Sequence, residues 1–372
     1  MKKNNINLYE KICSFENLHL AYVKARKGKR YKNDILQFGA KPERNLLQLR
    51  EELLRQSYQH GGYREFVVHD SKKRNIKAAP FRDRVVHHAL CNVIEPIFDK
   101  GFIYDSYACR RKKGTQGAVL RMRKFLRGAC VNNSENTEVL YVLKCDIAKY
   151  FDNVNHEILL CLIGKKINDE KVMWLVRMIV ESTNKNIGKG IPIGNLTSQL
   201  FANVYLNELD QFVKHTLRKK RYIRYMDDFV VLGGDKRELA RTKSLIGDFL
   251  QKELNLSLHP KKSLVQQTNN GIDFLGYVLF ELFTLLRKST VMRFVKRTKI
   301  YQNKLRHGLI SQEELDAATV SWVAYAKHAR SWMLRKSIGE RFGDASLREA
   351  VALSPVPSSN QLIRVSDINV IT

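Results

Sequence analysis

The stretch Tyr222-Ile-Arg-Tyr-Met-Asp-Asp-Phe-Val-Val-Leu232 decides the fold. Its two ends are apolar and rich in residues that favour strands, so we expect two short strands joined by a tight turn. The adjacent carboxylates Asp227 and Asp228 fall at that turn. Two neighbouring negative charges are costly unless a multivalent cation neutralises them, and hard divalent cations prefer carboxylate oxygens as ligands. The stretch therefore predicts a hairpin that presents two metal ligands.

A third candidate ligand, Asp146, follows an apolar run over residues 139–143 that has the composition of a buried strand. Magnesium is usually bound by one or two protein carboxylates together with substrate phosphates. Asp146 and the hairpin acids would supply such ligands from neighbouring strands. Two metal ions roughly 3.5–4 Å apart stabilise the attacking and leaving oxygens of an in-line phosphoryl transfer. In the alternative, Asp146 caps a turn and the acid pair lies in a solvated loop.

Several motifs, in this order along the chain, resemble those of reverse transcriptases. Asp146-Ile-Ala-Lys-Tyr-Phe-Asp-Asn resembles the first catalytic motif of that family, and Tyr225-Met-Asp-Asp228 resembles the second. Between them, Gly190-Ile-Pro-Ile-Gly-Asn-Leu-Thr-Ser-Gln199 occupies the position of the family's template-and-nucleotide helix. Its Ser198 or Thr197 is expected to cap that helix.

Further segments extend the resemblance on both sides. Leu256-Ser-Leu-His-Pro-Lys-Lys-Ser263 resembles the motif that bears a lysine near the leaving diphosphate, and Phe274-Leu-Gly-Tyr277 resembles the primer-grip turn. Upstream, residues 79–88 resemble the fingers segment of intron-type bacterial enzymes. The resemblance runs in order from about residue 60 to about residue 285.

The resemblance implies an α+β fold of the right-hand polymerase type, with fingers, a ferredoxin-like palm and a helical thumb. Apolar residues at helical spacing near the N-terminus predict a helical extension before the fingers. Proline and serine near the C-terminus predict a poorly ordered tail. The expected regions are an N-terminal helical basic extension (1–60), the fingers and palm (61–285), the helical thumb (286–355) and a flexible tail (356–372).

The reaction that the resemblance implies is attack of a primer 3′-hydroxyl on the α-phosphate of a deoxynucleoside triphosphate, directed by an RNA template. Two Mg²⁺ ions, for which Mn²⁺ could substitute, would be the cofactors. Lys262, with Lys261 in reserve, would protonate or screen the leaving diphosphate. The implied metal ligands are Asp146, Asp227, Asp228 and the backbone carbonyl of Ile147.

Phe151, five residues after Asp146, is the candidate sugar gate, because an aromatic ring against the ribose 2′ position would clash with a 2′-hydroxyl. In the alternative, Phe151 belongs to the core. A predicted strand pair near residues 63–79 carries cations that would face the triphosphate, since arginine can clamp phosphate with two hydrogen bonds. The expected nucleotide and template contacts are Lys73, Arg74, Lys77, Arg82, Ile147, Phe151, Ile193, Gly194, Ser198 and Gln199, and the expected primer grip is Phe274, Leu275, Gly276 and Tyr277.

One departure from the usual family pattern points to a particular group of reverse transcriptases. Ile193 stands where glutamine usually precedes Gly194, and Gln199 stands where proline usually follows Ser198. With the His87-His88 pair and a chain that lacks nuclease domains, this resembles the reverse transcriptases of diversity-generating retroelements. That resemblance implies copying of a template-repeat RNA with errors opposite adenines, and a pentameric, basic, helical accessory protein as partner.

Isoleucine offers a physical reason for such errors. Glutamine carries two donors and an acceptor, whereas isoleucine has none and is stiff about its first torsion. Losing a positioned polar contact can weaken discrimination, which depends on differential binding of transition states. In the alternative, Ile193 simply packs in the palm. Other readings that remain open are a group II intron-type, retron or phage-defence reverse transcriptase, and a non-catalytic RNA-binding protein on a polymerase frame.

Composition supports a nucleic-acid partner. The 372 residues carry a formal charge of +28, with a pI near 9.9, and such an excess favours a polyanion. The longest apolar stretch, residues 274–286, is too short to span a membrane and contains Glu281. The first residues show no signal-peptide pattern, so we expect the cytoplasm of a bacterial, phage-infected or archaeal host. The sequence also contains no phosphate-binding P-loop motif and no Cys-x-x-Cys pair.

Overall fold

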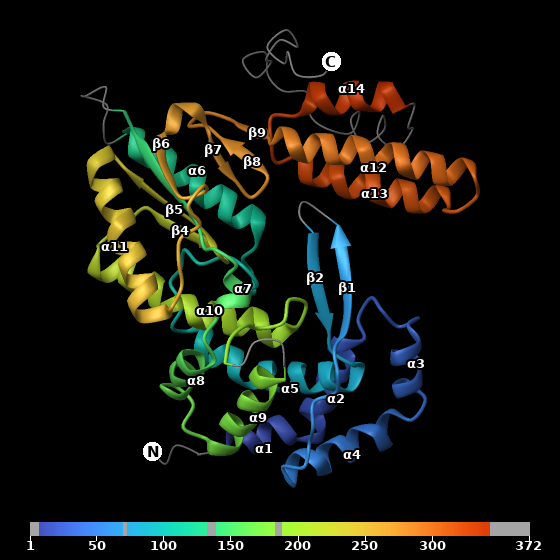
Figure 1. The fold of residues 1–372 in the computed structure, drawn as a ribbon. Coiled ribbons are helices and arrows are strands. Elements are labelled where there is room, and N and C mark those ends of the chain that lie inside the picture. Colours follow the sequence, from blue (N-terminus) through green and yellow to red (C-terminus); the bar gives the residue numbers. More distant parts are fainter. Residues whose placement is uncertain (1–6, 70–72, 132–138, 183–187, 343–372) are drawn as a thin grey trace. The chain divides into compact units, whose positions relative to one another are not determined.

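A computed structural model describes residues 7–69, 73–131, 139–182 and 188–342 (Figure 1). Its internal contacts divide the chain into two units. The first comprises residues 1–114 and 143–265, and the second comprises residues 115–142 and 266–372. The expected tail at 356–372 lies outside the described residues.

Four helices open the first unit, as the apolar spacing of the first 60 residues predicts. Asn7 caps α1, where its side chain accepts from the Tyr9 amide, and Ser14 caps α2 in the same way. In α4 the buried leucines Leu46, Leu49 and Leu53 share one face. These helices are α1 (Leu8–Cys13), α2 (Phe15–Ala25), α3 (Asn33–Gly39) and α4 (Pro42–Leu54).

A two-stranded antiparallel hairpin follows, formed by β1 (Arg64–His69) and β2 (Lys73–Ala78). The predicted strand pair near residues 63–79 is therefore confirmed. The hairpin extends away from α2 and the long helix α5 (Phe81–Asp99), as Figure 1 shows. Helix α5 is central to this unit, because it packs against α1, α2 and α10 (Leu196–Gln211).

A four-stranded sheet positions the candidate acids. Its strand order is β4-β5-β3-β6, so β5 lies between β4 and β3. The strands β3 and β5 are apolar along most of their length, as expected of strands covered on both faces. Helix α11 (Lys236–Leu254) packs against β5 and α10. The strands are β3 (Tyr141–Asp146), β4 (Tyr222–Tyr225), β5 (Asp228–Gly233) and β6 (Leu264–Gln267).

The remaining helices of the first unit follow β3. Asn155 caps α8 and Asp169 caps α9, each with a side-chain oxygen that accepts from backbone amides of the first turn. A short π-helix, Phe212–Thr216, continues from α10. The helices are α7 (Tyr150–Asn153), α8 (His156–Gly164) and α9 (Glu170–Glu181).

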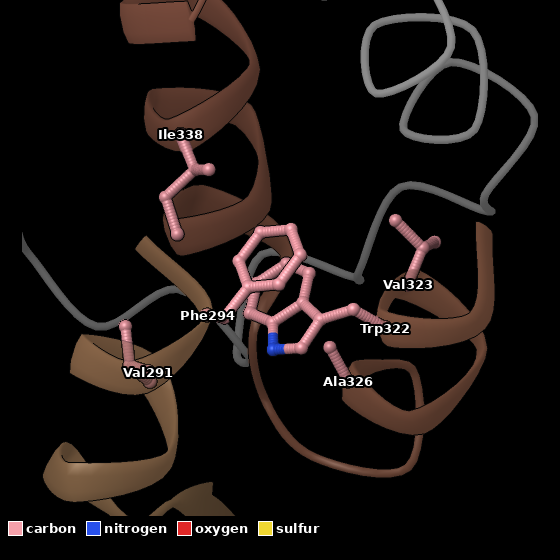
Figure 2. Close-up of a cluster of buried hydrophobic side chains, with 6 residues drawn as sticks. All are labelled: Val291, Phe294, Trp322, Val323, Ala326 and Ile338. Carbon is pink, nitrogen blue, oxygen red and sulfur yellow. The ribbon is translucent and has the colours of Figure 1, made fainter. Parts of the chain in front are cut away.

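In its described part, the second unit combines a three-stranded sheet with helices, three of which, α12 to α14, pack around an aromatic core. Phe294 stacks on Trp322 with a centroid distance of 3.9 Å and an interplanar angle of 6°, and Figure 2 shows Ile338 beside them. No helix in the described part of the chain is long and apolar enough to cross a membrane. The elements are α6 (Thr115–Val131), β7 (Ile272–Phe274), β8 (Tyr277–Leu279), β9 (Thr284–Leu286), α12 (Lys288–Arg306), α13 (Gln312–Ala326) and α14 (Trp332–Phe342).

Candidate active site

The hairpin predicted around the acid pair is present. Strands β4 and β5 pair antiparallel with Tyr225 opposite Asp228, which leaves Met226 and Asp227 as a two-residue turn. Asp228 is thus the first residue of β5 rather than a turn residue. Met226 has a φ of 58°, a left-handed conformation that side chains with a Cβ adopt at a cost. The turn must therefore be held by contacts from outside it.

Asp146 is the last residue of β3, and a second segment of chain runs beside it. The Asp146 carbonyl accepts from the His259 amide at 2.7 Å, and Ala148 donates to the Ser257 carbonyl at 2.9 Å. This pairing brings Lys262 to the Asp146 side chain, where Nζ lies 2.9 Å from both carboxylate oxygens. Lys262 is the residue predicted to act near the leaving diphosphate. In the structure it contacts Asp146, a predicted metal ligand. Its neighbour Lys261 is exposed.

The order of the strands brings the three acids to one region. Burial raises the pKa of the Cys145 thiol to about 12, with smaller contributions from the charges of Asp228 and Asp146, against a hydrogen bond from Ser263 and the charge of Lys243. Both carboxylates therefore lie within electrostatic range of one thiol. Asp227 similarly acts on Tyr150 at the start of α7, whose pKa is raised well above its usual value, chiefly by burial.

The donors fit a divalent cation in their chemistry. They are carboxylate oxygens, and the Asp146 carboxylate already holds one positive charge on both of its oxygens. Within residues 7–342 as far as they are described, no three His, Cys, Asp or Glu side chains gather closely enough to hold a metal by themselves. Magnesium does not require that, because one or two carboxylates, water and substrate phosphates usually complete its shell.

The segment between the acid motifs is joined to the β1–β2 hairpin. The Ile193 carbonyl accepts from the Lys77 amide at 3.0 Å. The Asn195 carboxamide accepts from the Ala79 amide at 3.3 Å and donates to the Lys77 carbonyl at 3.1 Å. Gly194 lies at this junction with a φ of 118°, where an added Cβ would come within 2.9 Å of Ile76. The predicted cap of α10 by Ser198 or Thr197 is wrong, because Asn195 holds the N-cap position and both others are buried inside the helix.

The candidate nucleotide contacts differ in their surroundings. Phe151 is half-buried on α7, with its ring centroid 5.5 Å from that of Tyr150. Lys73 and Arg74 are exposed on β2. Arg82 instead forms an ion pair with Glu52 and lies 5.2 Å from the Tyr58 ring centroid. The other predicted contacts are placed as follows: Ile147 is buried, and Lys77, Ile193 and Gln199 are half-buried.

His87 contacts one side chain through each of its ring nitrogens. Its Nε2 lies 3.2 Å from His60 Nε2, and its Nδ1 lies 3.4 Å from Thr197 Oγ1. His60 Nδ1 lies 2.6 Å from the Gly61 carbonyl, so His60 donates there. With two neutral imidazoles, the directions that satisfy all three contacts are Thr197 to His87, His87 to His60, and His60 to Gly61.

The predicted primer-grip turn lies in the second unit. Phe274 pairs with Tyr277 across the β7–β8 hairpin, and Leu275 and Gly276 form the turn with φ values of 52° and 88°. Tyr325 of α13 donates to the Leu275 carbonyl at 3.2 Å, and Tyr277 donates to the Tyr325 carbonyl at 2.9 Å. Helix α13 therefore holds this turn. No local sequence signal indicates that contact between α13 and the turn.

Sequence reasoning missed a second set of residues beside the acid turn. Arg224 and Asp210 are both fully buried and paired, with Nη2 2.7 Å from Oδ2. An arginine within an otherwise apolar strand was an available signal, because a buried charge requires a partner. Its partner, 14 positions earlier on α10, could not be identified without the fold.

Comparison with known proteins places the chain in a family. The family model described as "Reverse transcriptase (RNA-dependent DNA polymerase)" matches residues 68–279. Protein YkfC of Escherichia coli K12 is 27% identical over 271 residues, which cover 62% of this chain and 70% of that protein. The group II intron-encoded protein LtrA of Lactococcus lactis subsp. cremoris is 22% identical over 369 residues, covering 81% of this chain and 56% of LtrA.

A solved structure of telomerase from Candida albicans, in complex with a fragment of telomeric RNA, aligns with 80% of this chain and 62% of its own at 10% identity, with a TM-score of 0.48. The family match, together with the mixture of helices and sheets, fits a right-hand polymerase. The chain belongs to the reverse transcriptase family, and residues 68–279 carry its RNA-directed DNA polymerase domain. Members of this family use divalent metal ions. The chain spans about half the length of LtrA.

Proposed function

We propose that this protein copies an RNA template into DNA by two-metal nucleotidyl transfer at Asp146, Asp227 and Asp228. The observation that carries the proposal is the placement of Asp146 at the end of β3, beside the strand that begins with Asp228. The family match includes both segments. The proposal covers the described domain and does not depend on what else the protein carries.

The side chains would share the chemistry in this way. Asp146, Asp227 and Asp228, with the Ile147 carbonyl, would hold the ions, which supply activation of the hydroxyl and neutralisation of the diphosphate. The primer 3′-oxygen forms the new bond to the α-phosphorus, and the bond to the diphosphate breaks. Lys262 would screen or protonate the leaving group, and this role is supported by the position of its ammonium at the carboxylate of Asp146.

The regions of the polymerase are assigned on this basis. The four-stranded sheet with α10 and α11 is the palm, and the β1–β2 hairpin belongs to the fingers. In the second unit, helices α12 to α14 are the thumb, and the β7–β8 turn is the primer grip. Helix α12 suits a nucleic-acid backbone, since it contains no acidic residue and its cations are exposed. These cations are Lys288, Arg293, Lys296, Arg297, Lys299, Lys304 and Arg306.

The nucleotide contacts follow from the same assignment. Lys73 and Arg74 are exposed on the fingers hairpin, where cations can meet a triphosphate. Phe151 would exclude ribonucleotides. In this structure Glu52 of α4 holds the charge of Arg82, so Arg82 is assigned a structural role rather than a contact with the triphosphate.

Within the family, we assign the protein to diversity-generating retroelements. Support comes from Ile193, which lies shortly before the N-terminus of α10 and is half-buried. It places an apolar side chain where the family pattern has glutamine. Errors opposite template adenines would follow from the loss of the polar contact that glutamine would make there, because discrimination depends on differential binding of transition states. A pentameric accessory protein and a template-repeat RNA would be its partners.

An intron-associated role is the second candidate, and a specific observation favours it: the similarity to LtrA covers 81% of this chain. The experiment that separates the two is primer extension on an RNA template with magnesium, followed by sequencing of the cDNA. Product that depends on template and primer supports the polymerase. Errors concentrated at template adenines support the retroelement role, whereas uniformly faithful copying contradicts it and leaves the intron-type role.

A further inference from the structure

Arg224 lies two residues before the acid turn and is completely buried. Its partner Asp210, on α10, is equally buried. Taking both charges out of water is costly, so such a pair persists only where its geometry is good and the remaining hydrogen bonds are satisfied. Burial opposes the charge on Arg224, but Asp210 outweighs it and holds the pKa of the guanidinium above its usual value.

Every N–H of this guanidinium has an acceptor. Arginine presents five such donors in a fixed planar fork. Asp210 accepts from Nε and from Nη2, at 2.7 Å each. The remaining acceptors are Ser106 Oγ at 3.0 Å, Asn203 Oδ1 at 3.2 Å and the Met226 carbonyl at 3.1 Å.

The fifth contact is the informative one. The carbonyl of Met226 belongs to the peptide unit that precedes Asp227, and Met226 is the residue held at a φ of 58°. Arg224 therefore fixes the peptide plane from which Asp227 projects. Without that bond, the left-handed residue would be free to relax.

The network ties the turn to rigid surroundings. Asp210 and Asn203 both lie on α10, and Asp210 also accepts from the Tyr222 hydroxyl at 2.7 Å. On the other side, the Arg224 amide donates to the Asp105 carbonyl, and its carbonyl accepts from the Tyr107 amide, each at 3.0 Å. The turn is thus held between a helix and a segment that is remote in sequence.

We propose that Arg224, oriented by Asp210, is a positioning residue that sets the geometry of Asp227 and Asp228 for catalysis. The inference rests on the proposed function, because it assigns these acids a reaction to perform. Because Arg224 is completely buried, it would act through Asp227 and Asp228 rather than by contact with the substrate. Its effect is on the rate of the chemical step rather than on affinity for RNA or nucleotide.

The test is Arg224→Lys, which keeps the charge but has three donors instead of five. Single-nucleotide extension should show kcat lowered about 100-fold, the loss expected for a displacement of catalytic groups by ~1 Å, with KM for the nucleotide nearly unchanged. Arg241→Lys, an exposed arginine on α11, is the matched control and should behave like the parent. A kcat for Arg224→Lys equal to that of the parent would overturn the inference.

A second measurement separates positioning from general destabilisation and needs no activity. In amide hydrogen exchange, Arg224→Lys should accelerate exchange in residues 222–232 and leave α8 unchanged. Faster exchange throughout the first unit would show a merely structural role. Adding Met226→Gly, which removes the cost of the left-handed turn, should recover part of kcat. If the parent itself makes no DNA, the proposed function fails, while the exchange result still decides whether Arg224 holds the turn.

Discussion

Lys262 donates to both carboxylate oxygens of Asp146, although the two residues are 116 positions apart in the chain. The pair is accessible from solvent, with 37% of the lysine side chain and 20% of the aspartate side chain exposed. The ammonium therefore occupies oxygen atoms that a divalent ion would use. Metal binding at Asp146 must compete with it.

Replacing Lys262 by methionine should strengthen metal binding and weaken catalysis. Without nucleotide, Mn²⁺ affinity should rise about 1.4- to fivefold, because an exposed pair of this kind is worth ~0.2–1 kcal/mol. The extension rate should fall on the order of 100-fold if the ammonium also assists the leaving group. Electron paramagnetic resonance of free Mn²⁺ measures the first effect. Lys261→Met is the control, and equal Mn²⁺ affinity in both variants and the parent would refute the competition.

Phe151→Ala should admit ribonucleotides. The ring is half-buried on α7 just after Asp146, so its removal opens space where a 2′-hydroxyl would otherwise clash. We expect the ratio of kcat/KM for ribonucleotides over deoxynucleotides to rise roughly 10- to 100-fold. Phe151→Tyr keeps the ring and should keep the selectivity. If the alanine variant rejects ribonucleotides as strongly as the parent, the ring is a core residue and not a gate.

Stability should decrease below about pH 6.5 because of His87. Burial chiefly, with His60 and His88, lowers the pKa of His87 from its usual 6.5 to about 3. Between these values the unfolded chain binds the proton and the folded protein does not, so unfolding is favoured as pH falls. At pH 5 this amounts to about 2 kcal/mol.

The measurement is urea denaturation of parent and His87→Gln at pH 7 and pH 5. Glutamine does not titrate, so the variant should lose about 2 kcal/mol less than the parent over this interval, whatever its stability at pH 7. His88, whose pKa burial also lowers, to about 4, remains in both proteins and cancels in the comparison. An identical loss in both would show that His87 does not supply the pH dependence.

Gly194→Ala should destabilise the junction between β2 and α10. The residue has a φ of 118°, and a Cβ would come within 2.9 Å of Ile76. The expected cost is about 1–2 kcal/mol from the backbone conformation, plus displacement of Ile76. Gly62 has no atom within 4 Å of an added Cβ and no left-handed φ, so Gly62→Ala is the matched control. Equal stability of the two variants in urea denaturation would contradict this account of the junction.

The acid hairpin and the N-terminal helices could be predicted because their signals are local. Apolar runs on both sides of Asp227 and Asp228 predict two strands, and apolar spacing near the N-terminus predicts helices such as α4. The β7–β8 turn is instead expected from the family resemblance of residues 274–277, and both of its turn residues, Leu275 and Gly276, are left-handed.

The contacts that hold the site together could not be predicted in this way. Arg224 and Asp210 belong to different elements, and His60 reaches His87 across 27 positions. The expected cap of α10 failed for a related reason: Asn195 at the N-cap directs its side chain to Ala79 and Lys77 instead of to its own helix. Such partners are set by tertiary packing rather than by local sequence.

The most direct test of the central claim is primer extension on an RNA template with Mg²⁺, comparing the parent with Asp227→Asn. Asp248→Asn, an exposed aspartate on α11, makes the same charge change away from the site. The account predicts that the parent and Asp248→Asn synthesise DNA at similar rates, and that Asp227→Asn is slower by at least a factor of about 1,000. Comparable product from Asp227→Asn and the parent would contradict it.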